Sequence, residues 1–168
     1  MMYPCMRSRK TKYSNIIKKL GGAVIEIAAG SPDHINAMDM SEGYGDSGNP
    51  VGDKSQFIMS LFEQLDNNKK GITPIDRSII DRCVSLVYEE ARETKTIPTL
   101  KTLRSMLLRQ PEVEARSLAL KLELFTDGNL DAFAHETNVD VTNRIISYNI
   151  FNLGKQLKTM GLLVITDA

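Results

Sequence analysis

The sequence predicts a mainly α protein with one or two short β-strands, in which a helical bundle is joined to part of an α/β layer. Four segments with apolar residues at helical spacing follow one another between residues 53 and 128, a succession typical of a helical bundle. A short β-branched run lies on either side of them, and the first run follows a helical segment and a glycine turn. That order is typical of a layer of helices and strands.

The segment before the bundle, residues 13–52, is expected to hold a helix, a strand and a long loop. Apolar residues at helical spacing end at Gly21-Gly22, and the β-branched run 23–28 predicts a strand. Residues 29–53 are rich in glycine and proline, and a loop this long in a compact domain is usually functional or packed against something. Residues 1–12 are basic and are expected to form a flexible N-terminus.

The first two bundle helices have start signals of different kinds. Asp53 is expected to be the N-cap of the first helix, which ends at residues 66–68. Thr73 is expected to cap the second helix, with Pro74 at its first position and its end near Arg92. Residues at helical spacing form the apolar face expected for this second helix: Ile75, Ile79, Ile80, Cys83, Val84 and Val87.

Prolines open the other two bundle helices, and the chain then returns to the α/β layer. Pro98-Thr99 begins the third helix. Pro111 begins the fourth, which is expected to stop at Gly128. Four residues of this fourth helix are expected to face inward: Val113, Leu118, Leu122 and Phe125. In residues 129–168, the run 144–150 predicts a strand and the stretch from Leu153 onward an apolar helix, which ends without a cap as though the chain were cut short.

Composition limits the class of protein. Lys and Arg number 21, as do Asp and Glu, so the formal net charge is zero, which argues against a dedicated nucleic-acid binder. Cys5 and Cys83 have neither zinc-site nor redox-pair spacing, and Cys83 is expected to be a small buried hydrophobe. No apolar run approaches the roughly 18 to 20 residues needed to span a bilayer. These features predict a cytoplasmic protein, at most peripheral to a membrane.

The stretch Gly48 to Ser55, GNPVGDKS, is similar to a phosphate-binding loop. That motif needs G-x-x-x-x-G-K-[ST] after a strand, so that backbone amides surround the phosphates. Here the glycine spacing is one residue short, and Asp53 stands between the glycine and Lys54, where it would repel an anion. We therefore expect no nucleotide site in this stretch.

No other group of residues predicts catalysis. His34 and His135 lack neighbouring ligands at metal spacing and are expected at the surface or in caps. The carboxylates of Asp76, Asp81, Glu89 and Glu90 are expected on solvated helix faces. Thr137 and Asn138 suit a tight turn with local side-chain hydrogen bonds. The sequence thus predicts no catalytic, cofactor-binding or metal-binding residue.

Taken together, several segments resemble the conjugation ATPases, the TraE/TraC-like P-loop ATPases of type IV secretion in conjugative plasmids and transposons. The matching stretches are 13–22, 24–27, 35–40, 53–57, 118–128, 133–139 and 149–163. The resemblance implies that, in that family, a RecA-like domain carries its phosphate loop upstream of this region and its Walker B acidic pair downstream. The chain would then be the intervening part, a strand followed by a helical insertion, with no family catalytic residue carried onto it.

The resemblance implies a remnant or truncated segment of a conjugative-transfer ATPase that does not hydrolyse ATP by itself. Its expected role is protein interaction, with type IV secretion subunits or a full-length copy of the ATPase as partners. Two alternatives stay open. One is a small helical DNA-associated protein of a mobile element that uses its basic N-terminus, and the other is an ATPase whose missing motifs lie on another polypeptide.

Overall fold

The computed structural model describes residues 10–45, 47–65 and 71–167, and within them it places six helices and two strands. Their bounds are α1 (Lys10–Lys19), β1 (Ala23–Glu26), α2 (Pro50–Leu65), α3 (Pro74–Thr94), α4 (Leu100–Leu108), α5 (Val113–Thr126), β2 (Ile146–Asn149) and α6 (Lys155–Asp167). The fold is mainly helical with two short strands, which confirms the predicted class.

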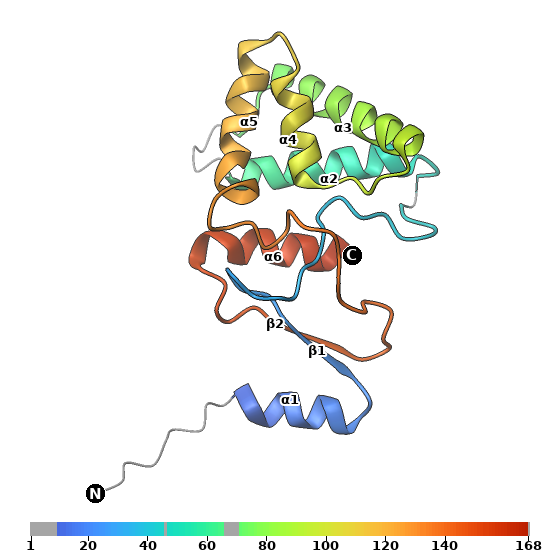
Figure 1. Ribbon diagram of the computed structural model, residues 1–168, viewed down its shortest axis with the longest axis vertical. Helices are drawn as coiled ribbons and strands as arrows, with labels where there is room; N and C mark the ends of the chain where they lie inside the picture. Colours follow the sequence, from blue (N-terminus) through green and yellow to red (C-terminus); the bar gives the residue numbers. More distant parts are fainter. Residues whose placement is uncertain (1–9, 46, 66–70, 168) are drawn as a thin grey trace, which may run out of the picture.

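Helices α2 to α5 pack together at one end of the molecule (Figure 1), with α2 against α3, α3 against α4 and α4 against α5. Their inward faces follow from helical spacing: in α3, Ile80, Cys83, Val84 and Val87 are at most 3% exposed. Short connections between the helices keep these faces together, so the bundle is built mainly from neighbours in sequence.

Three bundle helices begin with side-chain caps, and one of these caps, Thr73, is at the predicted residue. Thr73 and Thr99 each accept a hydrogen bond from the amide three residues on, and the side chain of that residue bonds back to the cap amide. The prediction that Asp53 caps α2 is wrong, because the helix already begins at Pro50. Asn49 takes that place, since its Oδ1 accepts the Gly52 amide at 3.1 Å.

Two residues expected in the core are exposed. Val113 is 79% exposed, because Leu118 lies five residues further along α5 and therefore on the far side of the helix. Ile75, in the first turn of α3, is 57% exposed. Helical spacing places Ile75 with Ile79, but it does not determine whether a neighbouring element reaches the first turn.

The two strands form a parallel pair in which Ala23 lies opposite Ile146. The connection between them contains the whole bundle (Figure 1). Both strands are shorter than predicted, although the Ile27 amide still donates to the Asn149 carbonyl at 3.1 Å beyond the end of β1. The Glu26 amide donates to Asp33 Oδ2 at 2.9 Å, and the Ile145 amide donates to Asn143 Oδ1 at 3.0 Å.

Gly22 is required where α1 turns back to the sheet. A Cβ at this position would lie 2.7 Å from the Ile145 carbonyl oxygen and 2.7 Å from Ile17 Cγ2. The chain therefore passes close to the start of β2 at this point, and only glycine fits without displacing its neighbours. This contact places α1 against β1 and β2.

The loop between β1 and α2 is packed rather than free. Ile35, Ala37 and Met38 are at most 1% exposed, and the Ala37 amide donates to the Phe133 carbonyl at 3.2 Å. Phe133 is itself fully buried. The two irregular segments 27–49 and 127–145 thus form a layer between the sheet and the bundle, with α6 against α2. Among the described helices, none has the length and apolar character needed to cross a membrane.

Candidate functional site

A buried ion pair joins the helical bundle to the layer beneath it. Lys54, in the second turn of α2, is 1% exposed, and its Nζ pairs with the carboxylate of Asp167 in the last turn of α6. A buried charge is stable only when it is paired. The pair therefore ties α6 to α2.

Two aromatic rings complete the surroundings of the Lys54 ammonium. Its Nζ lies 4.2 Å from the centroid of the Tyr44 ring and 4.9 Å from that of Phe57, distances typical of cation–π contacts. The Tyr44 hydroxyl donates to Asp167 Oδ1. Burial lowers the pKa of Lys54, while the hydrogen bond and charge of Asp167 raise it. Burial and the same carboxylate raise the pKa of Tyr44.

This cluster was missed from the sequence, although a signal was present. Lys54 lies four residues before Ile58 and seven before Leu61, so it belongs to the apolar face of α2. A lysine within such a face indicates a buried pair. The partner could not be found by spacing, since Asp167 is 113 positions away.

The stretch similar to a phosphate-binding loop is closed by its own carboxylate. Asp53 Oδ2 accepts the Ser47 hydroxyl at 2.7 Å and the Ser47 amide at 3.3 Å. A Cβ at Gly45, where φ is +84°, would lie 2.2 Å from the same oxygen. Lys54 points away from this loop toward Asp167. A phosphate here would have to displace an acidic side chain and break a buried ion pair.

Asn36 organises the long loop above the sheet. It is 2% exposed, and its Nδ2 donates to Asp39 Oδ1 and to the Pro98 carbonyl, both at 2.7 Å. Its Oδ1 accepts the Met38 amide at 3.0 Å. The Tyr88 hydroxyl donates to the Met38 carbonyl, and burial raises the pKa of that hydroxyl. The loop is thus held against both α3 and the α3–α4 connection.

The prediction that Thr137 and Asn138 bond to backbone groups of their own turn is wrong. Both side chains instead bond to a distant segment of the chain. Thr137 Oγ1 accepts the Asn36 amide at 2.8 Å. Asn138 accepts the His34 amide at 2.8 Å through Oδ1 and donates to the Pro32 carbonyl at 2.6 Å through Nδ2. The side-chain types were those of a turn, but their partners lie about a hundred positions earlier.

The two histidines lie against each other at the same crossing of segments. Their ring centroids are 4.4 Å apart, and His135 Nε2 lies 2.7 Å from Asp131 Oδ2. His34 Nδ1 is buried and has no hydrogen-bond partner. In the part of the chain that the structure describes, no three His, Cys, Asp or Glu side chains gather as metal ligands would. Of the two histidine rings, His135 thus has one carboxylate, that of Asp131, at hydrogen-bond distance.

The remaining candidate residues have structural partners. Cys83 is fully buried, as predicted, and burial raises the pKa of its thiol to about 11, which disfavours the nucleophilic thiolate. Asp76 belongs to the α3 cap, and Glu90 pairs with Arg109. Asp81 accepts the Ser55 hydroxyl at 2.7 Å. Asp81 and Glu90 are nevertheless exposed on polar helix faces, as expected, and Asp76 is half-buried.

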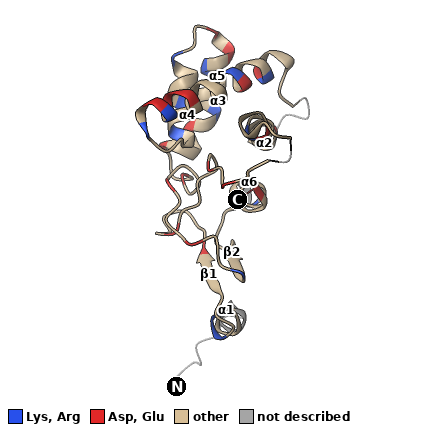
Figure 2. Cartoon of the chain, turned by 90° about the vertical axis from the view of Figure 1, so that its right-hand side faces the viewer, with Lys and Arg blue, Asp and Glu red and all other residues tan. Residues whose placement is uncertain are grey.

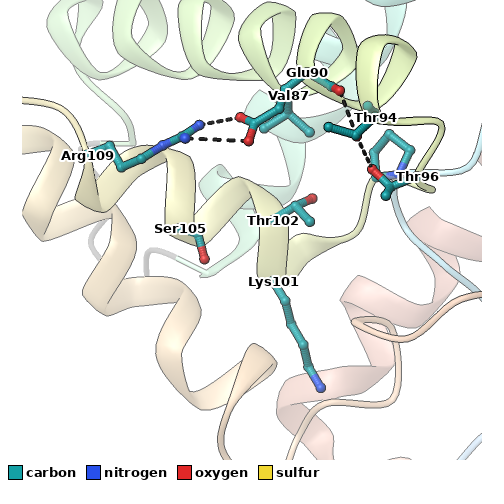
Figure 3. Close-up of a pocket in the computed structure, with 10 residues that line it drawn as sticks. Val87, Glu90, Thr94, Thr96, Lys101, Thr102, Ser105 and Arg109 are labelled. Carbon is teal, nitrogen blue, oxygen red and sulfur yellow. Dashed lines mark hydrogen bonds and ion pairs between the residues drawn. The ribbon is translucent and has the colours of Figure 1, made fainter.

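A groove of about 410 Å³ lies between α3 and α4, and Figure 3 shows its lining. The Glu90–Arg109 pair crosses one end, while the hydroxyls of Thr94 and Thr96 lie 2.8 Å apart at the other (Figure 3). Lys101 extends away from both (Figure 3). The rest of the lining is apolar or carries a single hydroxyl, so the groove offers binding surface but no nucleophile beside a base.

The basic N-terminus is only partly described. Lys10, Lys12, Lys18 and Lys19 lie on α1, which has no acidic residue in its first turn. Cys5, Arg7 and Arg9 lie outside the described residues. Acidic and basic residues are both distributed over α3 to α5 (Figure 2), so charge of one sign does not dominate this end of the molecule. DNA binding through residues 1–12 stays a prediction.

Comparison with known proteins identifies a solved structure with a similar fold. No family model matches the sequence, and the search of curated proteins gives no match. Among solved structures, the chain is similar to VirB4 of Thermoanaerobacter pseudethanolicus, with a TM-score of 0.74 and 17% sequence identity. The match covers 92% of this chain and 63% of the VirB4 chain. This chain thus has the fold of a large part of VirB4.

Proposed function

We propose that this chain is a helical segment of a type IV secretion ATPase that does not hydrolyse ATP by itself and acts through contacts with other proteins. The observation that carries the proposal is the fold shared with VirB4, a type IV secretion ATPase, over 92% of this chain. The resemblance of the sequence to conjugation ATPases points to the same group of proteins. The partners it suggests are other type IV secretion subunits or a full-length copy of the ATPase.

The absence of hydrolysis rests on the sequence and on Lys54. The 168 residues contain no G-x-x-x-x-G-K-[ST] run, so they lack the backbone cradle that binds β- and γ-phosphates in P-loop ATPases. The one lysine in a similar setting, Lys54, is buried against Asp167. Nucleotide binding would need that ion pair to break, with a cost of several kcal/mol.

Calorimetric titration of the purified chain with MgATP and MgADP tests this point. We expect no saturable heat at micromolar nucleotide, whereas an intact P-loop ATPase under the same conditions gives an isotherm. The variant Lys54→Met is the internal control. A saturable isotherm that Lys54→Met abolishes would show that the stretch Gly48 to Ser55 binds phosphate after all, and the proposal would be wrong.

Capture experiments test the second part. The tagged chain is mixed with a full-length type IV secretion ATPase and, separately, with an unrelated P-loop ATPase of similar size. We expect retention of the first protein only. Equal retention of both, or of neither, would contradict an interaction role within this machinery.

A further inference from the structure

Helix α5 has two apolar faces, and only one of them is covered by the bundle. The inner face contains the helix's buried residues: Ala115, Leu118, Ala119, Leu122, Phe125 and Thr126. On the other side, Val113, Leu120 and Leu124 are 79%, 57% and 45% exposed. Large side chains exposed in a row are unusual on a monomer, and a contiguous apolar patch commonly marks an interaction site.

The exposed residues form a narrow stripe with coiled-coil spacing. Together with exposed Ser117, the three residues follow one another at intervals of four, three and four. At about 100° per residue they fall within roughly 60° of one another, on the side opposite the inner face. Helix α5 lies at an outer edge of the bundle (Figure 1). Such a stripe is the seam along which two helices pair.

The charges beside the stripe fit a second copy of the same helix in antiparallel orientation. Glu114 and Lys121 follow one side of the stripe, and Arg116 and Glu123 follow the other, where Glu123 also lies 3.5 Å from Arg104 of α4. An antiparallel pair that places Val113 against Leu124 also brings Glu114 near the partner's Lys121 and Arg116 near the partner's Glu123. Opposite charges thus meet on both flanks. A parallel pair would instead place Arg116 beside the partner's Lys121, with repulsion between like charges.

We propose that the outer face of α5 is a self-association surface, through which two copies of this chain pack antiparallel about a twofold axis. The occupant is a second copy because the charges beside the stripe are complementary to themselves in the antiparallel orientation. Ser117, the small residue of the stripe, lies opposite the partner's Leu120 and gives that side chain room. The proposal does not depend on the function proposed above, since it uses only the geometry of α5.

Sedimentation equilibrium of the full chain tests the proposal. Four side-chain layers make a small interface, so we expect a dissociation constant on the order of 10–100 µM. The average mass should rise from 18.7 kDa toward twice that value as concentration increases. Leu120→Lys should stay monomeric, whereas the matched control Leu162→Lys on α6, where the leucine is 55% exposed, should behave like the wild type.

A charge exchange determines the orientation and is independent of the leucine variants. Glu114→Lys should weaken the dimer at low salt, and the double variant Glu114→Lys with Lys121→Glu should restore it, because the antiparallel flank is then paired again. A wild-type chain that stays monomeric at about 200 µM would overturn the proposal. So would loss of the dimer in Leu162→Lys alone, or failure of the double variant to recover while its far-UV circular dichroism is unchanged.

Discussion

The bundle and the layer beneath it are held together by contacts of different range. In the bundle, α2 to α5 pack against their neighbours in sequence, and their caps are formed by residues three positions away. In the layer, hydrogen bonds join residues about a hundred positions apart, as from His34 to Asn138 and from Asn36 to Thr137. The bundle can therefore form locally, whereas the layer needs both ends of the chain together.

The largest effect is expected where the two regions meet, at the buried ion pair. Asp167→Ala leaves the ammonium of Lys54, which is 1% exposed, without its carboxylate. We expect the free energy of unfolding to fall by about 3–5 kcal/mol, because an uncompensated buried charge is strongly destabilising. Urea denaturation measures this loss. The double variant Lys54→Met with Asp167→Ala removes both charges and should recover most of it, and equal losses in the two variants would contradict this explanation.

The same pair gives a pH dependence with a definite sign. Burial, the largest influence, lowers the pKa of Lys54 below its ordinary value of 10.5 in the folded chain. Between the folded-state pKa and that value the unfolded chain binds more protons at this lysine, so the contribution of Lys54 to stability should rise with pH through this window, whereas the raised pKa values of Tyr44, Tyr88 and Cys83 contribute the opposite slope. Without Asp167 the folded-state pKa falls further, and the rise should begin at lower pH in Asp167→Ala. Urea midpoints measured from neutral to alkaline pH should show this displacement.

A smaller effect is expected inside the layer, at Asn36. Asn36→Ala leaves the Met38 amide and the Pro98 carbonyl without the partners they have at 3.0 and 2.7 Å. Each unsatisfied buried group costs about 1–3 kcal/mol, so we expect a loss of roughly 3 kcal/mol. Hydrogen exchange should speed up in the loop 27–49 before it does in α4. The control Asn129→Ala, at an exposed position, should change stability by less than about 0.5 kcal/mol.

This difference in range also decides what the sequence could predict. Features that depend on residues within a few positions of one another were predictable. These are the bundle helices, the caps at Thr73 and Thr99 and the burial of Cys83. Val113 was placed on the wrong face because a single helix such as α5 can be apolar on two sides. The ion pair of Lys54 and the hydrogen bonds of Asn138 could not be predicted, because nothing in local spacing identifies a partner more than a hundred positions away.

The smallest effect is expected at a cap within the bundle. Thr73→Ala removes the hydroxyl that accepts the Asp76 amide at 3.1 Å. We expect a loss of about 1 kcal/mol, and Thr73→Ser should keep most of the wild-type stability because it retains the acceptor oxygen. Amide exchange should increase only in the first turn of α3, since the core contacts of this helix begin at Ile79. The contrary outcome is that Thr73→Ala destabilises the loop 27–49 as strongly as Asn36→Ala does. The two regions would then unfold as one unit, and the difference between local and distant contacts would not be reflected in their stabilities.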